Sequence, residues 1–202
     1  FPGAWARLLL LPAVVAALAE QAATLNTHTR YVQDGIVAYA ERLVAKFPAA
    51  LDTAMFTCTG SEANDLALRI AFDVTGGRGL IVTENAYHGV TVALADISPS
   101  LQPIGPHVRT IRAPDGYRAA EGTDLAQRFA ADIRDAAESL RAAGYTPAAL
   151  IVDTSFASDG IFMTPGVLAA RAEAIRAAGG LLIADAVQGG PGRMGACWGS
   201  AR

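Results

Sequence analysis

The stretch AALIVDTSFASDGIFMTPGVLAARAEAIRAAGGLLIA, residues 148–184, predicts a strand, a helix and a second strand in that order. Residues 148–152 and 181–184 are apolar without a break, a pattern typical of strands that are buried on both faces of a sheet. The Thr-Pro pair at 164–165 favours the start of the helix, and the Gly pair at 179–180 favours its end. Two such strands joined by a helix predict parallel neighbours in one sheet.

The rest of the chain repeats this alternation of strands and helices. The expected helices cover residues 12–21, 34–46, 62–72 and 124–143, and the further expected strands cover residues 54–58, 79–83 and 107–112. We therefore expect the α/β class, with a mostly parallel sheet covered by helices on both faces. Residues 1–50 are expected to form a helical lead-in, and residues 51–202 an incomplete α/β domain.

The composition excludes several classes of function. The 202 residues are 52% hydrophobic and 17% charged with a net charge of −3, which is typical of a soluble globular protein. Basic residues are scattered, so the chain offers no cluster for a nucleic-acid backbone. Cys58 and Cys197 lie far apart without metal-ligand spacing. We therefore expect neither a metal site nor a disulfide, and a cytoplasmic setting fits best.

An apolar run at residues 8–19 has two interpretations. Arg7 before it and the Ala-Leu-Ala at 17–19 are similar to a signal peptide. Pro12 interrupts the run, which is also too short to span a bilayer, so we favour a helix that begins at this proline and expect no membrane segment. The chain starts at Phe1 instead of methionine, which suggests that its true start lies upstream.

In a parallel sheet, ligands bind beyond the carboxyl ends of the strands, so the polar residues there are candidates for a site. They are residues 59–61, residues 87–89, Asp153 and Asp185. The glycines at 190, 192 and 195 also have the spacing of a dinucleotide-binding loop. No clear helical pattern follows them, and no further strand brings the acidic residue that such a site needs. We interpret these glycines as a flexible loop.

Each candidate allows a functional and a purely structural interpretation. Ser61 in CTGSEAND, residues 58–65, could help a helix N-terminus to hold a phosphate, or it could only cap the helix. Tyr87 could stack on a flat cofactor ring or lie at the edge of the core, and His88 could be a hydrogen-bonded bystander. Asp185 directly follows a buried strand. It therefore needs a cationic partner, either an arginine or a protonated ligand nitrogen.

Pyridoxal 5′-phosphate (PLP) has a phosphate, a flat aromatic ring and a ring nitrogen that an acidic residue keeps protonated. Three segments resemble motifs of the class III PLP-dependent aminotransferases. Residues 59–72 resemble their SGSEAN segment, residues 86–91 their YHG motif, and residues 183–195 their DEVQ.GfGR.G segment. The order and spacing of the three segments match too, and the resemblance extends from Pro12 to the end of the chain.

The resemblance implies that the sheet belongs to the cofactor-binding large domain of a fold-type I enzyme, with PLP as the cofactor. By position in the motifs, Gly60 and Ser61 would hold the cofactor phosphate. Tyr87 would stack on the pyridine ring, and Gln188 would lie near the phenolic oxygen of the ring.

The same motifs assign the remaining site residues and contain three departures. Asp185 would pair with the ring nitrogen, which makes it the candidate catalytic residue, and His88 matches the cofactor-binding motif without an assigned role. Ala186 replaces a glutamate of the family pattern, Pro191 a common phenylalanine, and residues 153–154 a common Glu-Pro pair. Loss of the glutamate puts in doubt a contact that would orient the site.

The largest departure is the lysine that binds the cofactor covalently in this family. The only lysine is Lys46, which precedes all three motifs, and we expect it to be an exposed residue within a helix. In the family the cofactor lysine follows the DEVQ segment, at a distance that would fall beyond Arg202. We therefore expect a fragment of a larger enzyme or the product of a truncated gene, inactive by itself.

The motifs favour an aminotransferase that moves an amino group between an amino acid or amine and a keto acid. Residues 26–34, 97–100 and 114–118 are similar to the branch that includes ethanolamine-phosphate phospho-lyase. Elimination of phosphate from a phosphorylated amine is therefore an alternative, and a non-catalytic remnant is another because the lysine is absent. The resemblance also implies a small-molecule substrate and a homodimer for the intact enzyme.

Overall fold

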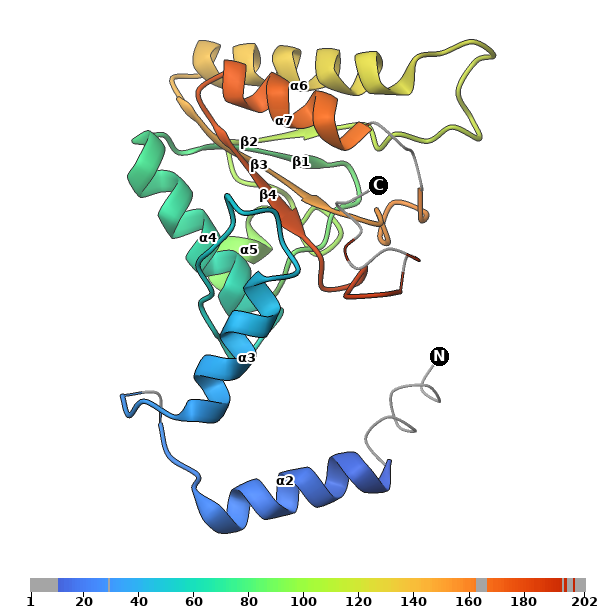
Figure 1. The fold of residues 1–202 in the computed structure, drawn as a ribbon. Helices are drawn as coiled ribbons and strands as arrows, with labels where there is room; N and C mark the ends of the chain where they lie inside the picture. Colours follow the sequence, from blue (N-terminus) through green and yellow to red (C-terminus); the bar gives the residue numbers. More distant parts are fainter. Residues whose placement is uncertain (1–10, 29, 163–166, 194, 196–197, 199–202) are drawn as a thin grey trace. The chain divides into compact units, whose positions relative to one another are not determined.

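The computed structural model describes residues 11–28, 30–162, 167–193, 195 and 198 (Figure 1). The chain divides into two compact units, Phe1–Ala54 and Met55–Arg202. The strands of the described chain all belong to the second unit. Among the helices described in either unit, none is long and apolar enough to cross a membrane.

Among its described residues, the first unit has the helices α2 (Pro12–Thr24) and α3 (Asp34–Val44). The proline of α2 stands at the first helical position, where its missing N–H costs no hydrogen bond, as predicted. Lys46 is exposed, as expected, but its predicted place within a helix is wrong. Its N–H bonds to the Leu43 carbonyl at 3.0 Å, in a tight turn that ends α3 shortly before Pro48.

The second unit is built around a four-stranded parallel sheet. Its strands are β1 (Gly79–Thr83), β2 (Val108–Ile111), β3 (Pro147–Asp153) and β4 (Leu181–Asp185), in the order β2-β1-β3-β4. Its helices are α4 (Gly60–Thr75), α5 (Val92–Ala95), α6 (Leu125–Ala142) and α7 (Val167–Ala177). The predicted α/β class is confirmed. The predicted helix start at 164–165 lies outside the described residues.

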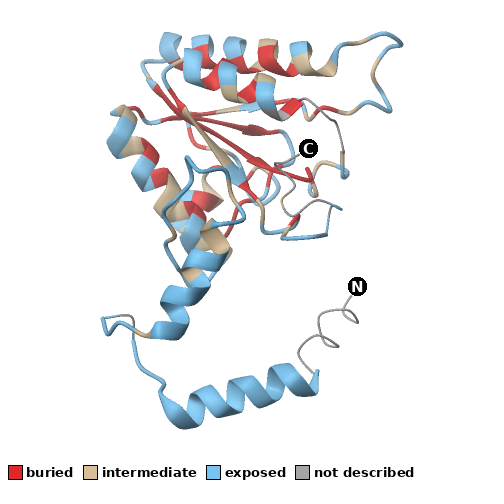
Figure 2. Ribbon diagram, in the orientation of Figure 1, coloured by how far each residue is buried: buried red, intermediate tan, exposed pale blue. Residues whose placement is uncertain are grey.

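Side chains that alternate along the strands form two cores, one on each face of the sheet. Ile81 and Leu150 pack with α6 and α7, whereas Leu80 and Ile151 pack with α4 and α5. Figure 1 shows α6 and α7 on one side of the sheet and α4 on the other, and Figure 2 shows the buried positions gathered along the strands between them. The unbroken apolar runs therefore reflect burial on both faces.

The expected strand at residues 54–58 is wrong. These residues pair with no strand of the described chain, and the Met55 and Phe56 side chains are 63% and 47% exposed. The Cys58 N–H instead donates to the Glu62 carboxylate at 2.7 Å, which is a local contact at the start of α4. A short apolar run does not specify a strand by itself, because its length and composition also suit other structures.

The helix α4 begins two residues before its predicted start, and Thr59 caps it instead of Ser61. Thr59 Oγ1 accepts a hydrogen bond from the Glu62 N–H at 3.1 Å, and the Glu62 carboxylate accepts one from the Thr59 N–H at 3.2 Å. This reciprocal capping box satisfies two backbone donors. The capping interpretation of Ser61 is therefore wrong. Gly76 ends α4 in the left-handed conformation with φ of 66°.

The order of the strands fixes where a ligand can bind. The chain passes from β1 to its neighbour β2 and then crosses back to β3 on the other side of β1. The carboxyl ends of β1 and β3 therefore flank the point where the strand order reverses. Ligands of open α/β sheets bind in the crevice at such a point. The residues that follow β1, β3 and β4 are thus the ones that a site would use.

Candidate functional site

A cavity of about 280 Å³ lies at the carboxyl ends of β1, β3 and β4. This volume is near the lower end of the range for small-molecule sites, which is roughly 300 to 1,000 Å³. The six residues that the sequence motifs single out all line it, namely Gly60, Ser61, Tyr87, His88, Asp185 and Gln188. The fold thus brings together residues from the start of α4, the segment after β1 and the end of β4.

Asp185 is the last residue of β4 and is 8% exposed. Its Oδ2 atom accepts a hydrogen bond from Asn64 Nδ2 at 2.9 Å and lies 3.0 Å from His88 Nδ1. Its Oδ1 atom accepts one from the Val187 N–H at 3.0 Å. The sequence predicts either an arginine or a protonated ligand nitrogen as the cationic partner of Asp185. Among the described residues, no arginine contacts this carboxylate.

The contacts of Asp185 determine its charge. Burial raises the pKa of the Asp185 carboxyl, but hydrogen bonds from His88, Val187 and Asn64, together with the electrostatic effect of His88, outweigh burial. The pKa of Asp185 therefore lies below its ordinary value. The carboxylate is ionised at neutral pH and presents a fixed negative charge to the cavity.

His88 is buried, and it joins Asp185 to the backbone around the cavity. Its N–H donates to Ser98 Oγ at 3.0 Å, and its carbonyl accepts from Asn64 Nδ2 at 2.9 Å. Its Nε2 atom is buried and has no hydrogen-bond partner among the described residues. A proton on Nδ1 allows the ring to donate to the carboxylate of Asp185. His88 is therefore more than the bystander that the sequence allows, because it orients the carboxylate.

Asn64 is a site residue that sequence reasoning missed. Its side-chain amide, buried in α4, bonds to both the His88 carbonyl and Asp185 Oδ2, each at 2.9 Å. Asn64 lies three residues after Ser61, and residues at this spacing share one face of a helix. This spacing is the signal that could have identified it. Asn64 connects α4, the segment after β1 and the end of β4.

Replacing Asn64 with leucine, which has a similar size, should destabilise the protein by about 1.5 to 3 kcal/mol near neutral pH, because a hydrogen bond to a charged group is lost. The lowered pKa of Asp185 contributes stability that is present above the unfolded carboxyl pKa of about 3.9 and is lost as the pH falls through the lower folded-state value. The cost of Asn64→Leu should therefore shrink in acid.

Urea unfolding near neutral pH and near pH 3, about one unit below the ordinary carboxyl pKa, measures this difference. Asn26→Leu is a matched control, because Asn26 is exposed in the first unit, and it should change the free energy of unfolding little at either pH. An equal cost of Asn64→Leu at both pH values would show that Asn64 does not act through the ionised carboxylate.

The start of α4 gives the cavity an anion-binding end. Gly60 and Ser61 are its first two residues, so their N–H groups have no acceptor within the helix. The positive end of the helix dipole lies at the same place. A Cβ atom at Gly60 would come within 2.7 Å of Val187 Cγ2, so a larger residue there would have to displace the exposed Val187 side chain.

Gly89 joins the segment after β1 to α4 at very close range. Its φ is 138°, and an added Cβ atom would lie 2.6 Å from both Leu94 Cδ1 and Ser61 Oγ. The hydroxyl of Ser61 in turn accepts a hydrogen bond from the Val90 N–H at 3.2 Å. Two glycines, at positions 60 and 89, therefore form part of the cavity wall. Neighbouring side chains occupy the space that a Cβ atom would take at each position.

The remaining candidate residues, Tyr87, Gln188 and Asp153, differ in their exposure and in their contacts. Tyr87 is 44% exposed, so it is not a residue of the core edge, and Gln188 is also exposed. Asp153 is engaged by its own loop: its Oδ1 atom accepts from the Ser155 N–H and hydroxyl at 2.8 Å, and its Oδ2 atom from the Ala157 N–H at 2.9 Å. Asp153 thus shapes the loop after β3.

The glycines after β4 lie in turns. Residues 187–193 form turns, and Gly190 and Gly192 have φ values of 51° and 80°. No helix begins there among the described residues, so the loop interpretation of these glycines holds.

Residues 10–202 match the sequence model of the family Aminotransferase class-III. The protein named Alanine--glyoxylate aminotransferase 2-like from Drosophila melanogaster is 36% identical over 197 residues, which cover 91% of this chain and 40% of that protein. A solved phospholyase from Arthrobacter, in complex with phosphoethanolamine, is 42% identical with a TM-score of 0.88, covering 95% of this chain and 47% of that one.

A taurine:2-oxoglutarate aminotransferase from Bifidobacterium kashiwanohense, solved in complex with PLP and glutamate, is 26% identical with a TM-score of 0.77. The match covers 94% of this chain and 46% of that one. The chain therefore spans less than half the length of these relatives. The family match covers nearly all of the sequence, including the three motifs around the cavity. The chain belongs to the class III aminotransferase family.

Proposed function

We propose that the chain is part of a PLP-dependent transaminase, which transfers an amino group between an amino acid or amine and a keto acid. The observation that carries this proposal is the ionised Asp185 carboxylate, held by three groups at a cavity that also contains a helix N-terminus. Membership of the family supports the reaction type. Residues 51–202 would form part of the cofactor-binding large domain, and residues 1–50 its helical lead-in.

The cavity suits PLP at each position that the motifs assign. Gly60 and Ser61 offer N–H groups and a hydroxyl to the phosphate at the start of α4. Tyr87 offers an aromatic face on which the pyridine ring can stack. Gln188 would lie near the phenolic oxygen of the ring.

PLP, when bound, supplies a protonated ring that accepts electron density from the α-carbon of the substrate. The role of Asp185 is to hold the proton on the ring nitrogen, for which its lowered pKa is suited because the carboxylate stays ionised. His88 and Asn64 bond to the same oxygen of Asp185 and so limit rotation of the carboxylate. These two residues position the catalytic group.

The covalent attachment of the cofactor needs a lysine that the second unit does not contain. The only lysine, Lys46, is exposed and follows α3 in the first unit. The 202 residues by themselves would therefore bind PLP without attachment and would be inactive. Borohydride reduction followed by mass spectrometry tests this point, and a cofactor adduct on Lys46 would contradict it.

Elimination of phosphate from a phosphorylated amine is the second candidate function. The Arthrobacter phospholyase structure, at 42% identity, favours it. The family match is shared by both reactions, so the chemistry of the ring and of Asp185 would be the same in each. The two functions differ in whether a keto acid is needed to accept the amino group.

The test is to incubate the full-length protein with an amino donor and a keto acid, and separately with phosphoethanolamine alone. The proposed function predicts amino transfer that depends on the keto acid. Phosphate release without a keto acid, together with absence of amino transfer, would overturn it in favour of the second candidate. Absence of both activities in cofactor-loaded protein would favour a non-catalytic remnant.

The proposed partners are a small-molecule amine or amino acid and a second copy of the chain, without nucleic acid or membrane. The exposed apolar side chains of α3, among them Ile36, Val37 and Tyr39, offer a surface that a homodimer could cover. Sedimentation of the full-length protein tests the dimer. We also propose a cytoplasmic location, because the two cysteines show no pattern of a disulfide framework.

A further inference from the structure

The loop after β3, residues 154–162, contacts the segment that follows β1, residues 84–90. Asp159 Oδ2 accepts a hydrogen bond from the Thr83 hydroxyl at 2.6 Å, and Asp159 Oδ1 accepts one from the Asn85 N–H at 3.1 Å. Thr83 is the buried last residue of β1, so the contact lies where the segment leaves the sheet. Asp159 therefore holds the start of segment 84–90 from a distant part of the chain.

Three serine hydroxyls also bond to the backbone of this segment, those of Ser61, Ser98 and Ser100. Asp159 is the only carboxylate that bonds to its backbone among the described residues. Asp159 thus restrains the start of the segment, at Asn85, whereas the serines, Asn64 and the contact of His88 with Asp185 restrain its later residues.

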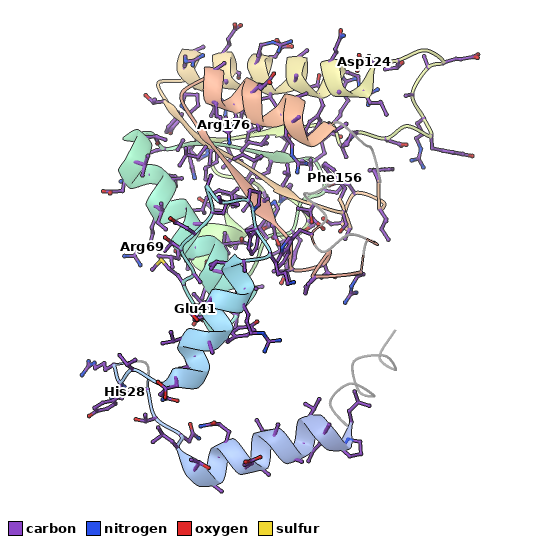
Figure 3. All side chains as sticks on the ribbon, in the orientation of Figure 1. His28, Glu41, Arg69, Asp124, Phe156 and Arg176 are labelled. Carbon is purple, nitrogen blue, oxygen red and sulfur yellow. The ribbon has the colours of Figure 1, made fainter. Side chains whose placement is uncertain are left out.

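The loop that carries Asp159 is held in a rare backbone conformation. The Phe156 carbonyl accepts hydrogen bonds from the N–H groups of residues 159–161 at 3.0 to 3.1 Å. Phe156 and Ile161 have φ of 51° and 63°, values that side-chain-bearing residues adopt only where their surroundings impose them. The buried Phe156 ring packs edge-on against Phe129 at 6.0 Å between ring centroids, beyond the end of β3 (Figure 3). These contacts therefore restrain the backbone of the loop that carries Asp159.

We propose that Asp159 is a positioning residue for the cofactor cavity. It does not line the cavity itself, but it fixes the start of the segment that carries Tyr87 and His88. The positions of the Tyr87 ring and of the His88 contact to Asp185 therefore depend on it. The inference rests on the proposed function, in which Tyr87 stacks on the cofactor and His88 orients Asp185.

The test compares Asp159→Ala with the unaltered full-length protein. Hydrogen exchange of the Asn85 amide in the cofactor-free protein should become at least about tenfold faster, because its acceptor is lost. The dissociation constant of PLP should rise about tenfold, the change that corresponds to one misplaced contact, and the visible circular dichroism of the bound cofactor should weaken. Asp159→Asn keeps an acceptor for Asn85 and a partner for Thr83, so it should restore most of the Asn85 exchange protection, the cofactor affinity and the circular dichroism.

Asp115→Ala is the matched control, because Asp115 also accepts backbone hydrogen bonds but only within its own loop. It should leave the Asn85 exchange rate and the cofactor affinity unchanged. If Asp159→Ala does not fold, Thr83→Val removes one donor to the carboxylate, and it should change exchange and affinity in the same direction by a smaller factor.

Unchanged exchange at Asn85 in Asp159→Ala would overturn the proposed restraint. Faster exchange with unchanged cofactor affinity and circular dichroism would overturn the positioning role. Failure of the unaltered protein to bind PLP would instead overturn the proposed function, and the exchange measurement on the cofactor-free protein would still decide whether Asp159 holds the segment.

Discussion

Under the proposed function, Asp185→Asn in the full-length protein should lower kcat by about a thousandfold or more, an effect at the upper end of those seen when one group that stabilises developing charge is removed. The asparagine side chain is neutral, so it cannot hold the proton on the ring nitrogen. The phosphate contacts proposed for Gly60 and Ser61 lie on α4, away from this substitution, so the cofactor should still bind. Steady-state kinetics and the cofactor content of the purified variant measure the two effects.

Asp132→Asn makes the same chemical change at an ion pair with Arg112, whose side chain is 60% exposed and which lies outside the cavity. It should leave kcat within about twofold of the unaltered value, because neither partner of this ion pair lines the cavity. A kcat for Asp185→Asn within about tenfold of the unaltered value, less than removal of one such group causes, would contradict the role of the carboxylate.

Gly89→Ala should destabilise the protein by about 2 to 5 kcal/mol, the sum of backbone strain and overpacking. The φ of Gly89 is 138°, and the new Cβ atom would lie 2.6 Å from both Ser61 Oγ and Leu94 Cδ1. Relief of this overlap would move Ser61 or segment 84–90. Cofactor affinity should therefore fall together with the melting temperature, which thermal unfolding and a PLP titration measure.

Gly122→Ala is the control that separates the backbone strain of Gly89→Ala from its steric overlap. Gly122 also has a positive φ, 79°, but no atom lies within 4 Å of a Cβ atom built there. Its substitution should cost about 1 to 2 kcal/mol, the strain of a left-handed residue, and should leave cofactor affinity unchanged. If the two alanine variants cost the same, the close packing at Gly89 would be irrelevant.

The strands of the sheet could be predicted because burial on both faces leaves unbroken apolar runs. Residues 79–83 and 148–152 are examples, and both form strands in the structure. Residues 54–58 show the limit of this signal. They are equally apolar, but no strand pairs with them among the described residues, and their Cys58 N–H bonds to Glu62 instead. A strand depends on its neighbour, which a local pattern does not contain.

The candidate site could be predicted only where a motif marks it. Asp185 and His88 belong to motifs, and the cavity contains both. Asn64 bonds to Asp185 across 121 residues, and Asp159 bonds to Thr83 across 76. Pairings between such distant residues arise from the strand order: the motif at residues 59–72 contains Asn64, but no local spacing reveals its partner or marks Asp159. The same holds for the choice between Thr59 and Ser61 as the cap of α4, which depends on the backbone conformation.

Asp185 is proposed to face the ring nitrogen of bound PLP and to keep it protonated. Nitrogen-15 NMR of the full-length protein loaded with PLP labelled at the ring nitrogen tests it most directly. We expect a ring nitrogen that is protonated near neutral pH in the unaltered protein and in Asp132→Asn, and unprotonated in Asp185→Asn. A ring nitrogen that is unprotonated in the unaltered protein, or that stays protonated in Asp185→Asn, would show that Asp185 does not hold this proton.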